Sequence, residues 1–169
     1  LNQTNLTTHV TVYGGAGLAE LIGDLTAVHA HADHILDLAD QHSLNYWRLS
    51  GLILKGWAMA REGAPEEGLA LMPRSLDDRI RLGASWYQVR YMCMLAETYL
   101  QSGDLEQGLE VLDKARSLAA SNEEHMWEAE IARREGEIRW ALGASLEEVE
   151  VHMQSAIHVA QRQSAKSFE

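Results

Sequence analysis

Apolar residues recur along the chain at the three- and four-residue spacing of amphipathic helices, in segments separated by short polar or glycine-containing stretches. In one such segment Leu25, Val28, Ala32 and Ile35 fall on one helical face. The same spacing predicts helices over 6–22, 25–42, 45–62, 65–82, 85–102, 105–120, 124–142 and 146–163. The fold class is therefore expected to be all-α.

Two of these segments are irregular. The first, 6–22, is rich in threonine, valine and glycine, which are poor helix formers, so we expect a helix with a frayed or partly extended N-terminal end. The fourth contains Pro73, which removes one backbone hydrogen bond and crowds the preceding turn. A kink or a short break is expected near Met72.

Capping residues precede several predicted helices. Asp24 suits the position before 25–42, and Pro65 suits the first position of its helix. Capping boxes, in which a serine or aspartate is followed three residues later by Gln or Glu, are predicted at Ser85 with Gln88, Asp104 with Gln107, Ser121 with Glu124, and Ser145 with Glu148.

A repeat of forty residues organises the pattern. Glycine recurs at this interval, and a small residue stands seven positions before each glycine. The glycines are Gly23, Gly63, Gly103 and Gly143, and the small residues are Ala16, Gly56, Ala96 and Gly136. Because two helices approach closely only where side chains are small, Gly56, Ala96 and Gly136 are expected to face Gly68, Gly108 and Ala115. The period predicts about four helical hairpins in a single domain 1–169, at 6–42, 45–82, 85–120 and 124–163.

The segment AETYLQSGDLEQGLEVLDKA, 96–115, resembles a tetratricopeptide (TPR) motif. The resemblance lies in the order of a small residue, Tyr99, Gly103-Asp104, Gly108, Leu112 and Ala115. Together with 56–72 and 127–169, it is similar to the TPR-like C-terminal region of large bacterial signalling proteins, which join a class III adenylate/guanylate cyclase or a DNA-binding domain to an AAA/STAND-type ATPase.

This resemblance implies a TPR-like α-solenoid, a right-handed superhelix, that binds a protein or peptide partner or a small effector and regulates a larger protein. The chain begins without Met and stops where a fifth aromatic helix start would fall, so we expect it to be a fragment of a longer array. The alternative is a structural oligomerisation scaffold, a homodimer formed through the terminal hairpins and burying 146–163.

The net charge and the single cysteine restrict the classes of partner and the cellular location that we expect. The chain of 169 residues has a net charge of −11, which argues against nucleic acid and against a polybasic membrane patch. Residues 1–47 contain no Lys or Arg. The single cysteine, Cys93, cannot form an internal disulfide, and neither a signal peptide nor a membrane-spanning run is recognisable. A cytoplasmic location is expected.

Catalytic motifs are not recognisable in the sequence, so neither an enzyme activity nor a cofactor is expected. A histidine cluster, His29, His31 and His34, is the one candidate for metal binding, with His31, His34 and Asp37 able to share a helical face. Against this, His29 and His31 align with apolar packing positions of the other repeats. Packing is the favoured interpretation.

The inner face of the superhelix is the predicted binding groove, because the first helix of each hairpin lines it in TPR arrays. Its candidate residues are Trp57, Arg61, Arg90, Met94, Glu97, Arg133, Arg134, Glu137 and Trp140. The arginines can bind carboxylates, and the apolar residues can contact side chains of a peptide. The alternative is that Glu97, Glu130 and Glu137 neutralise the arginines in weak surface pairs.

Aromatic residues near helix starts also recur with the repeat. They are Tyr46, Trp47, Trp86, Tyr87 and Trp127. We interpret them as packing between repeats rather than as a ladder for sugars or bases, because large aromatics at structural spacing are usually buried.

Overall fold

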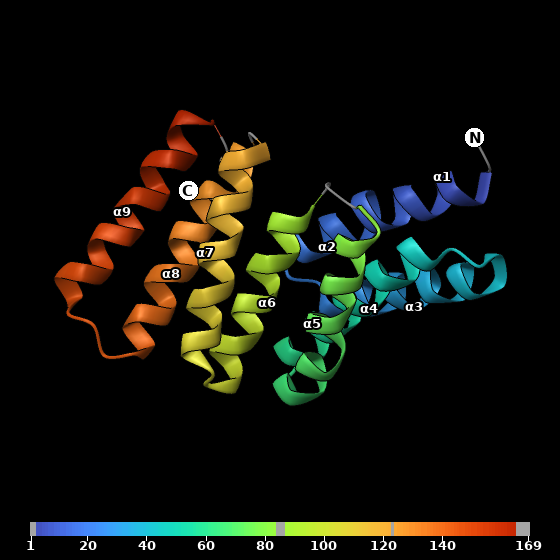
Figure 1. Ribbon diagram of the computed structural model, residues 1–169, viewed down its shortest axis with the longest axis horizontal. Coiled ribbons are helices and arrows are strands. Elements are labelled where there is room, and N and C mark those ends of the chain that lie inside the picture. The colour runs from blue at the N-terminus through green and yellow to red at the C-terminus, as the bar shows by residue number, and fades with distance from the viewer. Residues whose placement is uncertain (1–2, 84–86, 123, 165–169) are drawn as a thin grey trace. The chain divides into compact units, whose positions relative to one another are not determined.

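A computed structural model describes residues 3–83, 87–122 and 124–164, and these ranges are helical without a strand (Figure 1). The all-α prediction is confirmed. The elements are α1 (Gln3–Val10), the π-helical segment η1 (Thr11–Ala16), α2 (Gly17–Leu21), α3 (Leu25–His42), α4 (Asn45–Arg61), α5 (Pro65–Arg81), α6 (Gln88–Ser102), α7 (Leu105–Asn122), the 3-10 turn η2 (His125–Trp127), α8 (Glu128–Ala141) and α9 (Leu146–Arg162). None of the described helices combines the length and the apolar character that crossing a bilayer requires.

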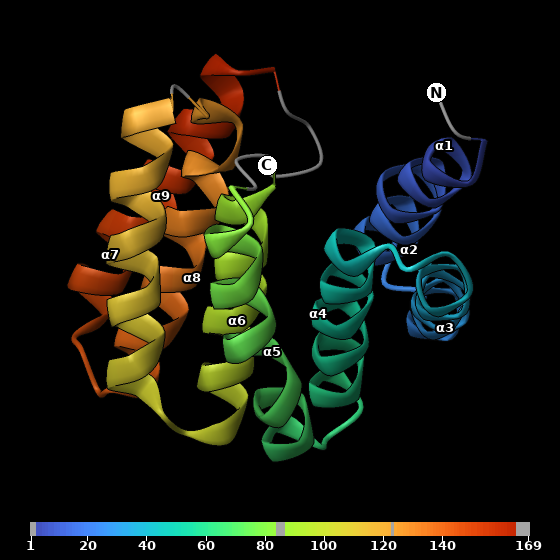
Figure 2. The same cartoon turned by 45° about the vertical axis from the view of Figure 1, so that its right-hand side comes forward.

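The chain divides into two compact units, residues 1–86 and 87–169. In the N-terminal unit, α3 packs against the α1–η1–α2 run and against α4, and α4 packs against α5 (Figure 2). In the C-terminal unit, α6 packs against α7 and α8, and α8 packs against α9. Within each unit, helices that follow one another in the sequence are therefore neighbours in space.

The N-terminal segment is helical from Gln3, so the expectation of a partly extended end is wrong. The hydroxyl groups of Thr7, Thr8 and Thr11 donate to carbonyl oxygens four residues earlier, at 2.8–3.1 Å, which accommodates threonine in a helix. The helix widens to a π-helix at η1, where Gly15 lies against the ring of His31. A Cβ atom on Gly15 would stand 2.7 Å from His31 Cε1, so a larger residue there would displace the His31 ring.

Helices α4 and α5 cross at Gly56 and Gly68, as the small-residue pattern predicts. A Cβ atom on Gly56 would lie 2.7 Å from Met72 Cγ, and one on Gly68 would clash with the carbonyl oxygen of Gly56. Helix α5 runs through Pro73, so the short break expected near Met72 is absent. Buried residues on both sides of the proline, Met72 and Leu76, hold the helix against its neighbours and offset the lost backbone bond.

In the C-terminal unit the small-residue prediction is only partly correct. A Cβ atom on Gly108 would lie 3.5 Å from the carbonyl oxygen of Ala96, which confirms that pair. Gly136, in contrast, faces α9 and not Ala115. A Cβ atom on Gly136 would lie 3.1 Å from His152 Cβ and 2.8 Å from Met153 Cε. The reason is that α9 is the hairpin partner of α8, as α5 is of α4.

Glycine ends each hairpin turn that the repeat predicts. Gly23, Gly63, Gly103 and Gly143 have φ angles of 74°, 97°, 85° and 86°, in the left-handed region that side chains rarely adopt. A Cβ atom at these positions would meet nothing within 4 Å, so backbone conformation and not space selects glycine there.

Three of the predicted helix starts are confirmed, and one of them is Pro65 at the first position of α5. The backbone N–H of Ala27 donates to Asp24 Oδ1 at 2.9 Å, and Ser145 and Glu148 form a reciprocal capping box. These caps fasten the starts of α3 and α9.

Of the other predicted caps, two differ and one lies outside the described residues. Ser121 lies inside α7 and donates to the carbonyl oxygen of Leu118, so its capping box is wrong. Gln107 donates to Glu110 Oε2 at 3.4 Å rather than reaching back to Asp104. Ser85 is outside the described residues, and α6 begins at Gln88, after Tyr87.

Candidate binding groove between α4 and α5

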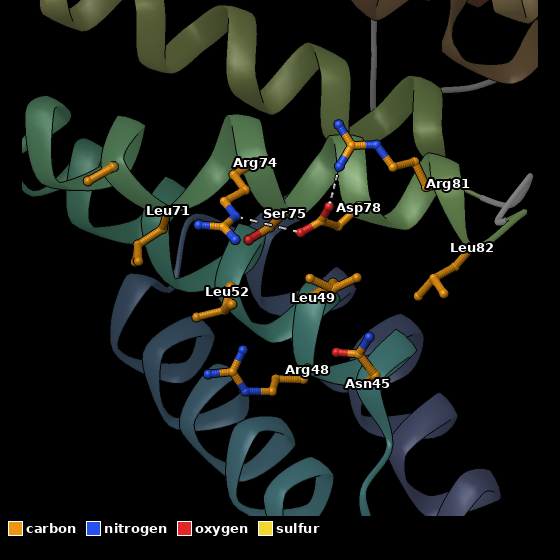
Figure 3. Close-up of a pocket in the computed structure, with 11 residues that line it drawn as sticks. Asn45, Arg48, Leu49, Leu52, Leu71, Arg74, Ser75, Asp78, Arg81 and Leu82 are labelled. Atoms are coloured by element: carbon orange, nitrogen blue, oxygen red, sulfur yellow. Dashed lines mark hydrogen bonds and ion pairs between the residues drawn. The ribbon is translucent and has the colours of Figure 1, made fainter.

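An open groove of about 550 Å³ runs between α4 and α5 in the N-terminal unit (Figure 3). It is lined by Asn45, Arg48, Leu49 and Leu52 of α4, by Ala70, Leu71, Arg74, Ser75, Asp78 and Arg81 of α5, and by Leu82. The lining positions of each helix are three or four residues apart, because one face of each helix borders the groove. We call this cavity the α4/α5 groove.

The floor of the α4/α5 groove is apolar. Leu49 is buried, Leu52 and Leu71 are half-buried, and Leu82 is exposed at one end. Ser75 is also buried, and its small side chain leaves the floor open. A floor of this kind can hold aliphatic side chains of a bound segment by removing them from water.

Three arginines surround this floor, and one aspartate stands between two of them. Arg81 Nη1 lies 2.8 Å from Asp78 Oδ1, and Arg74 Nε lies 3.8 Å from Asp78 Oδ2 (Figure 3). Arg48 Nε donates to Asp40 Oδ1 at 3.2 Å, outside the groove. The Arg74 side chain is 90% exposed, so these pairs are solvated and weak. With Asp78 and the adjacent Asp40 counted, the three arginines leave one net positive charge at the groove, in a chain of net charge −11.

The predicted groove residues of the N-terminal unit, Trp57 and Arg61, lie together on α4. Trp57 is buried, and the guanidinium carbon of Arg61 stands 5.8 Å from the centre of its ring. This cation–π contact stabilises the end of α4.

The predicted residues of the C-terminal unit are divided between α6 and α8. On α6, Arg90, Met94 and Glu97 are buried, and Arg90 faces the rings of Tyr87 and Trp127 at 5.6 and 6.0 Å. On α8, Trp140 is exposed.

Four of these residues form one ion-pair cluster together with Glu130. Arg134 contacts Glu97, Glu130 and Glu137 at 2.7, 2.8 and 3.1 Å, and Arg133 contacts Glu130 and Glu137 at 2.6 and 2.5 Å. The pairing that the sequence suggested is present, but it is not confined to the surface, because the Arg134 and Glu97 side chains are only 12% and 4% exposed.

The surrounding glutamates keep Arg134 charged. Burial alone lowers the pKa of Arg134, and the attraction of Glu97, Glu130 and Glu137 outweighs it, so its pKa lies above the ordinary value. Burial, reinforced by the negative charge of Glu130, raises the pKa of the Cys93 thiol far above its ordinary value. The thiol therefore stays protonated and unreactive.

The histidine cluster of α3 is dispersed. His29 Nε2 lies 3.0 Å from Glu62 Oε2, and His31 packs against Gly15, while His34 and Asp37 are exposed. Within the described ranges, no group of three or more His, Cys, Asp or Glu side chains is arranged to hold a metal ion.

The aromatic residues of the repeat are largely in the interior. Trp47 and Trp127 are buried and Tyr46 is half-buried, so the packing interpretation is confirmed for the two tryptophans. Trp86 lies outside the described residues.

Sequence reasoning did not select the arginines of the α4/α5 groove. The TPR resemblance directed attention to the first helix of each hairpin, whereas Arg74 and Arg81 belong to the second helix of theirs. One signal in the sequence was available. Arg74, Asp78 and Arg81 are spaced four and three residues apart, so they share one face of a helix whose first turn is acidic.

Comparison of the chain with protein-family models, with curated proteins and with solved structures finds no match. What the chain does must therefore be inferred from its own residues.

Proposed function

We propose that this chain is a non-enzymatic binding module, built from TPR-like helical hairpins, that holds an acidic peptide segment of a protein partner in the α4/α5 groove. The observation that carries the proposal is the position of Arg48, Arg74 and Arg81 around an apolar floor, in a chain whose net charge is −11.

Arginine suits this role because its planar guanidinium can donate two parallel hydrogen bonds to a carboxylate. Arg74 and Arg81 share one carboxylate, that of Asp78. Both guanidinium groups therefore retain N–H donors that face water. An exposed ion pair is worth about 0–1 kcal/mol, so exchanging it for a ligand carboxylate costs little.

The shape of the groove favours a peptide over a small effector. Pockets for small molecules bury most of the ligand surface, whereas the α4/α5 groove is open along two helices. An extended or helical segment can place carboxylates on the arginines and aliphatic side chains on the leucine floor at the same time.

The repeat supports the wider setting of this proposal. The forty-residue period, the left-handed glycines at the hairpin turns and the packing of sequence neighbours are features of TPR-like solenoids. In this setting the array belongs to a larger bacterial signalling protein of the cytoplasm, a cyclase, ATPase or transcriptional regulator. Peptide binding would shift the packing of adjacent hairpins and so regulate the attached domains.

A second candidate function is an oligomerisation scaffold that pairs through the terminal hairpins. It is favoured by exposed apolar residues of α9, which are Leu146, Val151 and Ile157. Light scattering separates the two functions: a stable dimer that Val151→Asp dissociates supports the scaffold, and a monomer supports the peptide-binding module.

Selection from a library of short random peptides displayed on phage tests the proposal. We expect the immobilised chain to enrich peptides with clustered Asp and Glu, and we expect Arg74→Glu to abolish the enrichment. Arg162→Glu, which makes the same charge change at the exposed end of α9, is the matched control and should enrich the same peptides. Enrichment without acidic residues, or enrichment that Arg74→Glu does not change, contradicts the proposal.

A further inference from the structure

A second cavity lies at the start of α4, also in the N-terminal unit. It has a volume of about 600 Å³ and is lined by Asn5, Leu6 and His9 of α1 and by Leu44, Asn45, Tyr46 and Trp47. We call it the aromatic hollow. Asn45 lines both the aromatic hollow and the α4/α5 groove, so the two cavities adjoin at this residue.

The walls of the aromatic hollow are held in place by their neighbours. Trp47 Nε1 donates to Asn5 Oδ1 at 3.0 Å, and the His9 ring meets the Trp47 ring edge to face at 5.7 Å between centroids. The Tyr46 and Trp47 rings meet in the same way at 4.8 Å. Because α1 and α4 fix these rings together, the hollow exists before any ligand enters and little conformational entropy is lost on binding.

The chemistry of the aromatic hollow is opposite to that of the groove. Leu6 is 54% exposed at its edge, and Val10, one helical turn further along, is exposed as well. None of the residues that line it is a lysine or an arginine. The hollow therefore suits a large apolar side chain, and it lacks the guanidinium groups that the groove offers to a carboxylate.

Asn45 is exposed and borders both cavities, and its side chain carries an amide. An amide carries both a donor and an acceptor, so it can bond to the N–H and the C=O of a peptide backbone passing over it. Its position at the junction suits a chain that continues from one cavity into the other.

From this arrangement we infer that the α4/α5 groove and the aromatic hollow form one bipartite site. Its ligand is a peptide with carboxylates at one end, held by Arg48, Arg74 and Arg81, and with a large aromatic or aliphatic side chain at the other end, held against Leu6 and Trp47. The inference rests on the proposed function of the groove and adds the second half of the ligand to it.

Defined fluorescent peptides test the bipartite site on the full chain by fluorescence anisotropy. The intact probe joins a run of Glu and Asp through two glycines to a Phe-Leu pair, made in both orders. A second probe replaces Phe-Leu by Ser-Ser, and a third replaces the acidic run by Ser and Asn. Because burial of one large apolar side chain is worth about 1.5–3 kcal/mol of transfer free energy, we expect the better intact probe to bind roughly tenfold or more tightly than the Ser-Ser probe.

Two variants assign this gain to the two cavities. Leu6→Asp should remove the gain from Phe-Leu and leave the affinity for the Ser-Ser probe unchanged, whereas Arg74→Glu should weaken binding of both acidic probes. Leu146→Asp is the matched control for Leu6→Asp, because Leu146 is an exposed leucine, 71% accessible, at the start of α9. It should change neither affinity. Circular dichroism confirms that each variant keeps its helices.

The outcomes separate the two proposals. If the acidic probes bind through Arg74 but Phe-Leu adds no affinity, or adds affinity that Leu6→Asp does not remove, the bipartite site is wrong and the groove proposal stands. If the acidic run adds nothing, the proposed function itself fails. A concentration-dependent dimer that both Leu6→Asp and Arg74→Glu dissociate would show that a second copy of the chain, and not a peptide, occupies the site.

Discussion

Arg134 of α8 donates from Nη2 to Oε2 of Glu97 on α6 at 2.7 Å, and both side chains are almost fully withdrawn from water. The two residues are 37 positions apart, and their contact fastens the second helix pair of the C-terminal unit to the first. Removing one partner of a largely buried ion pair leaves the other charge poorly solvated.

Glu97→Gln is therefore expected to destabilise the chain by about 1–3 kcal/mol, below the full cost of an isolated buried charge, because Glu130 and Glu137 still neutralise Arg134. Urea denaturation followed by circular dichroism measures the change. The control is Glu110→Gln, which removes an exposed pair with Lys114 and should have little effect. Equal effects of the two variants would contradict the role given to Glu97.

The ion pairs of Glu135 should make the stability of the fold depend on pH. Burial raises the pKa of its carboxyl, but hydrogen bonds from Arg139 and Arg116 outweigh burial and hold it below the ordinary value of 4.5. A carboxyl whose pKa is lowered on folding contributes stability above its unfolded value and loses that contribution as the pH falls through the folded value. The stability difference between wild type and Glu135→Gln should thus be largest above pH 4.5 and should shrink below it. Melting temperatures of both proteins across the acid range measure this, and a constant difference would refute it.

Gly68 predicts a steric effect at the α4–α5 crossing. A Cβ atom there would clash with the carbonyl oxygen of Gly56, so Gly68→Ala should destabilise the chain by about 1–3 kcal/mol although alanine favours helix. Gly14→Ala is the control, because a Cβ atom at Gly14 meets only Val10 Cγ1 at 3.8 Å. Thermal melting should show a lower midpoint for the first variant and an equal or higher one for the second.

Removal of the Asp78 carboxylate should strengthen peptide binding in the α4/α5 groove. Its carboxylate lies between Arg74 and Arg81 and competes with any bound carboxylate (Figure 3). Asp78→Asn should increase the affinity for an acidic peptide up to about fivefold, since each solvated pair is worth about 0–1 kcal/mol, and the gain should fall as salt is added. Asp113→Asn removes a more exposed carboxylate that also pairs with an arginine, Arg116 of the C-terminal unit, and it should leave the affinity unchanged.

Local signals in the sequence were reliable where one residue sufficed to specify the backbone. Gly63 and Gly103 lie at turns that need a positive φ, and Ser145 with Glu148 marks the start of α9. The same Ser-x-x-Glu pattern at Ser121 failed, because the alanine-rich end of α7 continues the helix past it to Asn122. A capping pattern does not identify a helix start reliably when strong helix formers precede it.

The candidate site was less accessible from the sequence. Arginines were expected on the first helix of each hairpin, and there Arg133 and Arg134 are paired with glutamates. Arg74 and Arg81 are exposed, but their proximity to the leucines of α4 depends on how α5 crosses α4. The small-residue pattern predicted that Gly56 faces Gly68, but it did not indicate which other residues of the two helices border one groove.

The sequence by itself determined the helices, their hairpin turns and the acidic character of the chain, because these depend on residues a few positions apart or on composition alone. The tertiary structure decided which charges are neutralised and which face water. Glu97 contacts Arg134 only after α6 and α8 have packed. Asn45 borders both the aromatic hollow and the α4/α5 groove only because α1 and α5 both pack against α4. Packing brings such residues together through side-chain volume and close approach, and a one-dimensional pattern does not record either quantity.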